Sequence, residues 1–204
     1  MSKGDLTHQA ILNRATGLAS QIGLGGLTIG ALADEMELSK SGLFAHFRSK
    51  EALQIQVLEY GAALFVEAVV RPALHAPRGE PRLRDLFERW MDWARTSPLP
   101  GGCLFVAAAT EFDDRPGPVR DRLAQLQRDW LSVIATSFAK GAGEGHFLAD
   151  QDPEQFAQDL YGIMLSLHHY SRLLGDAKAE QRARRAFDAL LAAATAPVLP
   201  TTTR

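Results

Sequence analysis

The chain has 204 residues, of which 46% are hydrophobic and 23% charged, as in an ordinary globular protein. The N-terminal residues lack the apolar segment of a signal peptide, and no run approaches the roughly 18 apolar residues expected of a membrane span. A single cysteine excludes an internal disulfide framework and favours a cytoplasmic location. The net charge of −2 does not by itself indicate a nucleic-acid-binding protein, although a small basic face would escape this test.

Nearly the whole chain is expected to be helical, because apolar residues recur at three- and four-residue steps and strand-like alternation is absent. The first helix is predicted over 7–22 and is ended by the glycine-rich segment 23–27. Two short helices follow within 28–47. A longer helix is predicted over 50–71, where Pro72 stops or kinks it.

Loops rich in glycine and proline separate the remaining helices, which are expected at 83–95, 103–111, 118–140, 153–174 and 177–194. The helix at 103–111 is almost entirely apolar, which is typical of a helix buried on all sides. The segment 141–145 is expected to be flexible, and the residues from Pro197 onward to form a frayed tail. The sequence therefore predicts an all-α fold.

Residues 28–53 predict two short helices joined by a tight turn and followed at once by the start of a third. Thr28, Ser39 and Ser49 are residue types that cap helix N-termini. Leu38, in the turn, is expected to point inward. The apolar positions behind the first cap share one helical face: Ile29, Leu32, Ala33 and Met36. A major-groove recognition helix needs an N-terminal cap, small and polar residues on its exposed face, and apolar residues on the opposite face that anchor it in the core.

The charge of this segment is locally basic. Between residues 38 and 50 the chain carries Lys40, His46, Arg48 and Lys50 and no acidic residue. A local basic face of this kind suits contact with a phosphate backbone.

Segment 28–53 resembles the DNA-binding domain of the TetR family of bacterial transcriptional regulators. The family pattern is Ser-Lys-small-small-aliphatic-aromatic-x-His-Phe, followed by x-Ser-Lys-Glu-Ala-Leu, and residues 39–47 and 49–53 match it. The resemblance implies a helix-turn-helix DNA-binding domain over 1–50 and a helical ligand-binding and dimerisation domain over 51–204. It implies a homodimeric repressor that a small apolar effector releases from a pseudo-palindromic operator.

The resemblance also assigns the positions that would contact DNA. It places Leu43 and Phe47 in the core. It would make Thr28 a phosphate contact, and His46 and Lys50 clamps on the DNA backbone. The full set of implied DNA-binding residues is Thr28, Lys40, Ser41, Gly42, Phe44, Ala45, His46 and Lys50.

Two of these positions depart from the family pattern. Phe44 stands where tyrosine is usual and lacks the hydroxyl that commonly reaches a phosphate, and Gly42 stands where threonine is common. With Lys40 as the only long donor on this face, direct base readout is expected to be sparse. Specificity would then depend more on the helix that begins after Thr28, on the N-terminal residues and on DNA shape.

The second half of the chain offers a candidate ligand cavity, although a plain hydrophobic core explains the same aromatic residues equally well. The candidate lining is Trp90, Trp93, Phe105, Phe112, Tyr161, Met164 and His168. The apolar segments 103–110 and 161–170 contain no Lys or Arg that would balance an anion. A neutral or weakly polar effector of roughly aromatic size is therefore expected.

The predicted helix at 153–174 has two apolar faces, and only one of them can serve the subunit's own core. Two such helices from each subunit would form a four-helix bundle about a two-fold axis. Which face meets the partner stays open. The candidate interface residues are Phe156, Leu160, Ile163, Leu167, Leu174, Ala183, Phe187 and Leu190.

No metal site and no cofactor are expected. His168 and His169 cannot share one ion, because adjacent helical residues point about 100° apart. Glu111, Asp113 and Asp114 flank a Pro-Gly turn and are interpreted as a solvated loop rather than a catalytic carboxylate pair.

Three further features bear on function. Cys103 is interpreted as a packing residue, with a redox sensor as the alternative. The basic cluster in the last helix is interpreted as a solvated face: Arg182, Arg184 and Arg185. No nucleophile, phosphate-loop or dinucleotide motif indicates an enzyme. The alternative function is an effector-independent DNA-binding or protein-interaction module.

Overall fold

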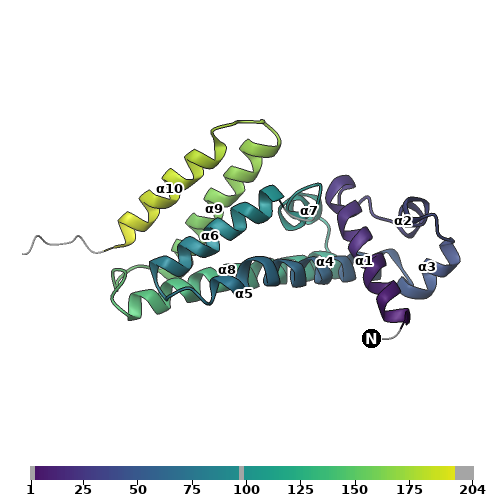
Figure 1. Ribbon diagram of the computed structural model, residues 1–204, viewed down its shortest axis with the longest axis horizontal. Helices are drawn as coiled ribbons and strands as arrows, with labels where there is room; N and C mark the ends of the chain where they lie inside the picture. The colour runs from purple at the N-terminus through teal and green to yellow at the C-terminus, as the bar shows by residue number, and fades with distance from the viewer. Residues whose placement is uncertain (1–2, 97–98, 196–204) are drawn as a thin grey trace, which may run out of the picture. The chain divides into compact units, whose positions relative to one another are not determined.

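The computed structural model describes residues 3–96 and 99–195, and every regular element within them is helical (Figure 1). The α-helices are α1 (Lys3–Ile22), α2 (Ile29–Met36), α3 (Lys40–Phe47), α4 (Lys50–Phe65), α5 (Arg71–Ala73), α6 (Glu80–Thr96), α7 (Leu104–Phe112), α8 (Pro118–Gly143), α9 (Pro153–Arg172) and α10 (Ala179–Ala194). The all-α prediction is confirmed. The predicted frayed tail from Pro197 lies outside the described residues.

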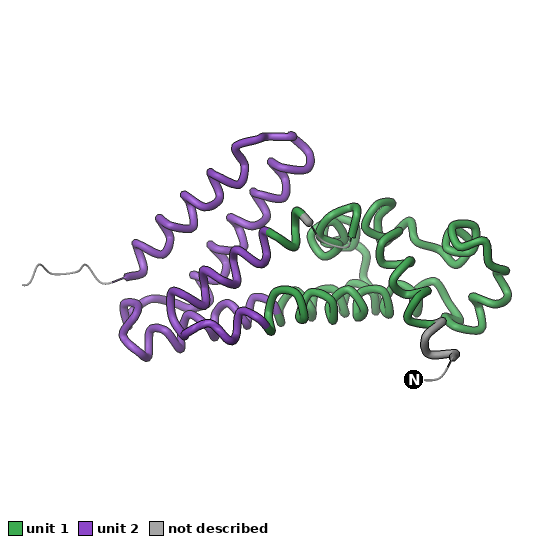
Figure 2. The backbone as a smooth tube through the Cα atoms, viewed as in Figure 1, with its two compact units in different colours: residues 1–71, 92–129 green, residues 72–91, 130–204 purple. Residues whose placement is uncertain are grey.

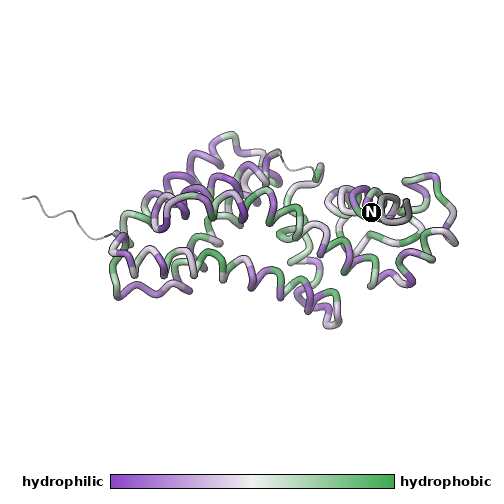
Figure 3. The backbone as a smooth tube through the Cα atoms, turned by 60° about the horizontal axis from the view of Figure 1, so that its bottom comes forward, coloured by the Kyte–Doolittle hydropathy of each residue, from purple (hydrophilic) through white to green (hydrophobic). Residues whose placement is uncertain are grey.

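The chain divides into two compact units, shown in green and purple in Figure 2. Unit 1 comprises residues 1–71 and 92–129, and unit 2 comprises residues 72–91 and 130–204. Hydrophobic and hydrophilic residues are interleaved along the helices of both units (Figure 3), as the helical period of the sequence predicts.

Local capping sets the helix starts in the N-terminal part of unit 1. The Thr28 and Ser49 hydroxyls each accept a hydrogen bond at 3.0 Å from the backbone N–H three residues later. The Ser39 hydroxyl accepts from the Gly42 N–H at 3.2 Å. Glu37 ends α2 in the left-handed conformation, with φ of 54°, and this produces the tight turn before α3.

The core of unit 1 forms around α1, which contacts α2, α4 and α7. One buried stripe of α1 (Ile11, Ala15 and Ala19) provides this contact surface. Leu38, by contrast, is 45% exposed, so the prediction that it points inward is wrong. The left-handed residue just before it turns the chain and leaves the Leu38 side chain outside the core. The deepest apolar side chains contributed by the other segments are Leu24, Leu27, Leu32, Leu43, Phe47, Leu53, Val57 and Leu58.

The helical segment Lys50–Ala73 is long and apolar enough to cross a membrane by length and composition only, and its most apolar 18-residue window has a mean hydropathy of 1.4. The expectation that no uninterrupted apolar run approaches a membrane span is not contradicted, because Glu59 and Glu67 interrupt this segment. A core helix passes the same test, and Leu53, Val57 and Leu58 of this segment are fully buried. We therefore assign the segment to the protein core.

Pro72 does not stop this segment. A π-helix, η1 (Val66–Val70), follows α4, and α5 continues through the proline. Proline lacks an N–H and its ring crowds the carbonyl four residues earlier, and the wider turn of η1 just before it gives the ring more room.

Unit 2 is built on aromatic packing. The Phe138 ring stacks on Phe147 at 4.6 Å and on Phe156 at 4.2 Å, measured between ring centroids. Phe87 of α6 and Phe187 of α10 meet at 4.3 Å. These contacts tie α6, α8, α9 and α10 into one core, within which α9 and α10 pack side by side.

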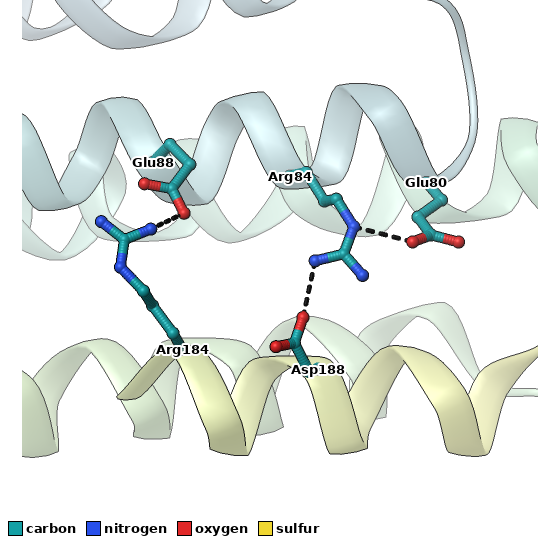
Figure 4. Close-up of polar contacts among 5 residues, drawn as sticks. All are labelled: Glu80, Arg84, Glu88, Arg184 and Asp188. Atoms are coloured by element: carbon teal, nitrogen blue, oxygen red, sulfur yellow. Dashed lines mark hydrogen bonds and ion pairs between the residues drawn. The ribbon is translucent and has the colours of Figure 1, made fainter. Parts of the chain in front are cut away.

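Ion pairs across the solvent side of α6 and α10 fix the pairing of these helices (Figure 4). The Arg84 guanidinium donates to Glu80 at 2.7 Å and to Asp188 at 2.6 Å, and Arg184 pairs with Glu88. The hydrogen bond to Asp188 is the main reason that the pKa of Arg84 is raised. Exposed pairs of this kind contribute little stability, so they act mainly on orientation.

The segment 141–145 is partly helical, because α8 extends to Gly143. The prediction of a flexible segment is therefore wrong for its first residues. A Cβ atom at Gly141 would lie 2.6 Å from the Cα atom of Gly79. Glycine is needed there so that α8 can approach the loop before α6 closely.

Candidate nucleic-acid interface

Helix α3 has one buried and one exposed face. Leu43 and Phe47 are each 1% exposed and anchor the helix in unit 1. The outward positions are all exposed: Lys40, Ser41, Gly42, Phe44, Ala45 and His46. The structure therefore brings six of the eight predicted DNA-binding residues onto one accessible helical surface.

The other two predicted contacts, Thr28 and Lys50, begin α2 and α4. Thr28 is half-buried, because its hydroxyl caps α2. Lys50 is exposed, and its Nζ donates to the Gly25 carbonyl oxygen at 2.6 Å. The ammonium group thus has one donor engaged with the α1–α2 loop and keeps donors for a phosphate.

The exposed face is basic but carries unusual apolar surface. Arg48 ends α3 with a positive φ of 60° and is exposed, as is Lys40. Glu35, on the neighbouring helix, is paired with Arg14, which offsets its charge. Phe44 is 52% exposed. An exposed ring on a groove-facing helix can contact a thymine methyl group.

Two family models match the chain over the elements just described. The model of bacterial regulatory proteins of the tetR family matches residues 11–57, which include α2 and α3. The model of the tetracyclin repressor-like C-terminal domain matches residues 79–187, more than half of the chain. The chain belongs to the tetR family. It is accordingly a helix-turn-helix transcriptional regulator.

Relatives with known names agree with this assignment. The HTH-type transcriptional repressor NemR of Escherichia coli (strain K12) is 25% identical over 170 residues, which cover 82% of this chain and 84% of NemR. A TetR transcriptional regulator from Chloroflexus aurantiacus J-10-FL superposes with a TM-score of 0.83 at 24% identity, covering 94% of this chain and 96% of that one. AibR, in complex with isovaleryl coenzyme A and operator DNA, superposes with a TM-score of 0.72 at 21% identity, covering 92% and 97%. At these identities the two structures show the shared fold.

The candidate effector-lining residues are divided between the units. Trp93, Phe105 and Phe112 belong to unit 1, and Trp90, Tyr161, Met164 and His168 to unit 2. In unit 1, the Phe65 ring meets Trp93 edge-on at 5.5 Å and Phe105 at 6.3 Å. A cavity shared by all seven residues stays a prediction.

His168 is, with Trp93, one of two candidate lining residues whose buried ring nitrogen has no hydrogen-bond partner among the described residues. In His168 this nitrogen is Nε2. Burial lowers the pKa of His168, and the positive charges of Arg172 and His169 lower it further. The ring is therefore held in its neutral form, which suits an uncharged polar partner.

The candidate dimer residues are mostly buried within unit 2 itself. Phe156, Leu160, Leu167, Ala183 and Phe187 are each no more than 6% exposed, so this stripe supplies the subunit's core. Ile163 and Leu190 are half-buried, and Leu174 is 56% exposed. A groove of about 570 Å³ lies between α9 and α10 and includes Ile163, Leu167 and Ala183 in its walls. The use of these residues in a dimer stays a prediction.

Glu111 is a polar contact that the sequence analysis misassigned. It lies inside α7 and its carboxylate accepts hydrogen bonds from the Leu24 N–H at 3.2 Å and the Gly25 N–H at 2.7 Å. The solvated-loop interpretation is therefore wrong for Glu111, although Asp113 and Asp114 are exposed as predicted. A glycine-rich loop leaves backbone N–H groups that need acceptors, and this need is the sequence signal that could have predicted a carboxylate partner such as Glu111.

The remaining candidates are structural. Cys103 is 2% exposed, and burial raises the pKa of its thiol, so packing explains it better than redox sensing. Within the described residues no three His, Cys, Asp or Glu side chains could hold a metal ion together. Arg182 pairs with Asp176, and Arg184 with Glu88, on the solvated side of α10.

Proposed function

We propose that this chain is a homodimeric repressor that binds a pseudo-palindromic operator and is released by a small, neutral or weakly polar effector. Residues 1–50 would form the DNA-binding domain, and residues 51–204 the effector-binding and dimerisation domain. The protein would act in the cytoplasm as a regulator, with no catalytic activity. The name of NemR, a repressor, supports the direction of regulation.

One observation carries the DNA-binding part of the proposal. Helix α3 is anchored by Leu43 and Phe47, while its small, polar and basic residues face solvent. A helix of this kind can enter a major groove, and we expect the flanking Thr28 and Lys50 to contact phosphates.

The α9–α10 groove supports a dimer contact with a second copy of the chain. Its walls combine apolar Ile163, Tyr170 and Ala186 with Asp159 and Arg182. A two-fold axis brings the same surface of both subunits together, so that Asp159 of one subunit can face Arg182 of the other. A dimer would also supply two recognition helices for two half-sites one helical turn apart.

The expected effector is argued from the lining candidates. Aromatic rings and the neutral His168 favour an apolar molecule with one polar group, and the absence of Lys and Arg from 103–110 and 161–170 disfavours an anion. AibR has been crystallised with both isovaleryl coenzyme A and operator DNA. This supports a protein of this fold responding to an organic ligand.

The DNA proposal is tested by selecting duplexes from a random-sequence library with the wild-type chain. We expect enrichment of a sequence with two inverted half-sites, bound with a dissociation constant of about 10⁻⁸ M or tighter at physiological salt. Selection that enriches no sequence would refute the proposal. Neutral aromatic compounds are then screened for thermal stabilisation and for release of the selected duplex; stabilisation only by phosphorylated or polycarboxylate compounds would refute the effector class.

The dimer contact is tested with Ile163→Glu, which places a charge in the α9–α10 groove. We expect sedimentation velocity to show a folded monomer where the wild type is a dimer. Gln181→Glu is the matched control, because Gln181 is exposed on α10 but does not line the groove. An unchanged dimer in the Ile163 variant would place the interface elsewhere.

The alternative, an effector-independent DNA-binding or protein-interaction module, predicts a different result. DNA binding would persist, and no compound would stabilise the protein or release the duplex. This alternative is favoured if the aromatic residues proposed to line the effector cavity form an ordinary hydrophobic core instead.

A further inference from the structure

The glycine-rich loop between α1 and α2 is held by side chains from two other helices. The Leu24 and Gly25 N–H groups donate to the Glu111 carboxylate of α7, at 3.2 and 2.7 Å. The carbonyl oxygens of the same two residues accept from Gln54 Nε2 at 2.7 Å and from Lys50 Nζ at 2.6 Å. Side chains of α4 and α7 therefore bond four backbone groups of the loop, of which the Leu24 carbonyl oxygen also accepts from the Leu27 N–H at 3.3 Å.

The fit between the loop and the carboxylate is close. A Cβ atom at Gly23 would lie 2.8 Å from Glu111 Oε1, and one at Gly25 would lie 2.9 Å from Glu111 Oε2. Gly23 also has a φ of +83°, which L side chains rarely adopt. Glycine at these positions leaves space for the carboxylate, so the backbone of the loop can pack directly against Glu111.

A second hydrogen bond connects the segment before α7 with the end of α1. The Gly101 N–H, just before α7, donates to the Ser20 Oγ near the end of α1 at 2.9 Å. A Cβ atom at Gly101 would lie only 1.6 Å from the Ser20 carbonyl oxygen. The end of α1 and the loop after it are thus held from both ends of α7.

We propose that Glu111 is a positioning residue for DNA binding: it does not touch DNA but fixes the loop that places Thr28 and Lys50 against the phosphate backbone. Thr28 follows the loop directly and caps α2. Lys50 is held on Gly25, whose N–H is held by Glu111. Displacement of α7 therefore reaches both candidate phosphate contacts through the Glu111 carboxylate, in addition to the hydrogen bond between Gly101 and Ser20. This inference rests on the proposed function, since it concerns how the chain binds DNA.

The test uses Glu111→Gln in the full chain, with the duplex selected by the wild type as the probe. The amide is similar in shape but presents an NH₂ group to a backbone N–H, so one hydrogen bond is lost. We expect roughly five- to tenfold weaker binding and a slope of log K against log salt reduced by about one, as the Lys50 contact is lost. Asp113→Asn is the matched control, because Asp113 is exposed and its substitution changes the charge equally.

A double-mutant cycle with Lys50→Ala separates positioning from a general loss of stability. If Glu111 acts through Lys50, Glu111→Gln weakens binding much less in the Lys50→Ala background than in the wild type. Circular dichroism at the assay temperature establishes that each variant is folded. Additive losses, or a Glu111→Gln variant with wild-type affinity and salt slope, would overturn the proposal.

A second pair of variants covers the case in which Glu111→Gln does not fold. Gly25→Ala places a methyl group against the carboxylate and is expected to weaken binding, whereas in the Glu111→Ala background it should cost little more. Equal losses in both backgrounds would count against the proposal. A wild-type chain that binds no duplex refutes the proposed function itself, and is distinguishable from wild-type binding that Glu111 variants leave unchanged.

Discussion

Helices α3 and α9 each bury one face in the core of their own unit, and they differ in what the other face presents. The outward face of α3 carries Lys40, Ser41 and His46, with Phe44 as its one large apolar residue. The C-terminal half of α9 and the residues just after it expose four large apolar side chains, which lie among polar ones such as His169 and Arg172: Leu165, Tyr170, Leu173 and Leu174. A basic, acid-free surface fits a phosphate backbone, whereas exposed apolar surface on a helix fits a protein partner. The residue types of the exposed face thus indicate the partner more directly than the buried face does.

The strongest test of this comparison is Leu167→Asp in α9. Leu167 is 5% exposed, and an unpaired carboxylate at such a position costs roughly 3 kcal/mol or more of the free energy of unfolding. Urea denaturation followed by circular dichroism measures the loss. Leu165→Asp is the control, because Leu165 is 38% exposed on the same helix and its substitution should cost far less. Equal midpoints for Leu167→Asp and the wild type would show that the inward face has been misassigned.

The DNA-binding side of the comparison is tested next with Lys50→Ala, which removes one predicted phosphate contact at the start of α4, just after α3. Binding to all sequences should weaken about equally, and the salt slope should fall by about one. Fluorescence anisotropy over a salt series gives the slope. Lys140→Ala removes an exposed charge from α8 and should leave the slope unchanged. A wild-type slope in the Lys50 variant would remove this residue from the set of DNA contacts.

Phe44 provides a finer test, because it is the apolar exception on the α3 face. If its ring contacts a thymine methyl group, replacing that thymine by uracil in the selected duplex should weaken binding about fourfold, the value of one buried methyl group. Phe44→Ala should abolish the sensitivity to uracil, while His46→Ala should retain it. If no thymine in the site shows this sensitivity, Phe44 does not read the sequence through a methyl contact.

The sequence predicted most of the fold because the decisive signals were local. Thr28, Ser39 and Ser49 cap helices with the N–H groups three residues later. The 3.6-residue period marked the buried positions Ile29, Leu32 and Ala33. The caps and the buried positions depend on neighbours within one or two helical turns. The predicted DNA contacts came instead from the resemblance to the TetR family, and six of them lie on the exposed surface of α3.

Most of the failures have a different origin, since they depend on residues far apart in the chain. Leu38 is the exception, because the left-handed Glu37 beside it turns its side chain outward. Glu111 was misassigned because its partners, Leu24 and Gly25, lie in another segment. Gly141 was expected to be flexible because only the fold reveals its approach to Gly79. On α9, periodicity found both apolar stripes but did not indicate which one the subunit's own core would use.

The smallest expected effect is a pH dependence of stability linked to His168. This residue adds a polar group to the two apolar stripes described on α9. Burial is the main reason that the pKa of His168 lies below its ordinary value of 6.5, so the unfolded chain binds a proton here more readily than the folded one. Stability linked to this ring is therefore fully present above pH 6.5 and is lost as the pH falls from there toward the lowered pKa. Denaturation midpoints measured from neutral to mildly acidic pH should fall less steeply in His168→Phe than in the wild type. His75→Phe, at an exposed position, should keep the wild-type slope. If His168→Phe also keeps it, the ring is not desolvated in solution, and the neutral polar group assigned to the effector site loses its support.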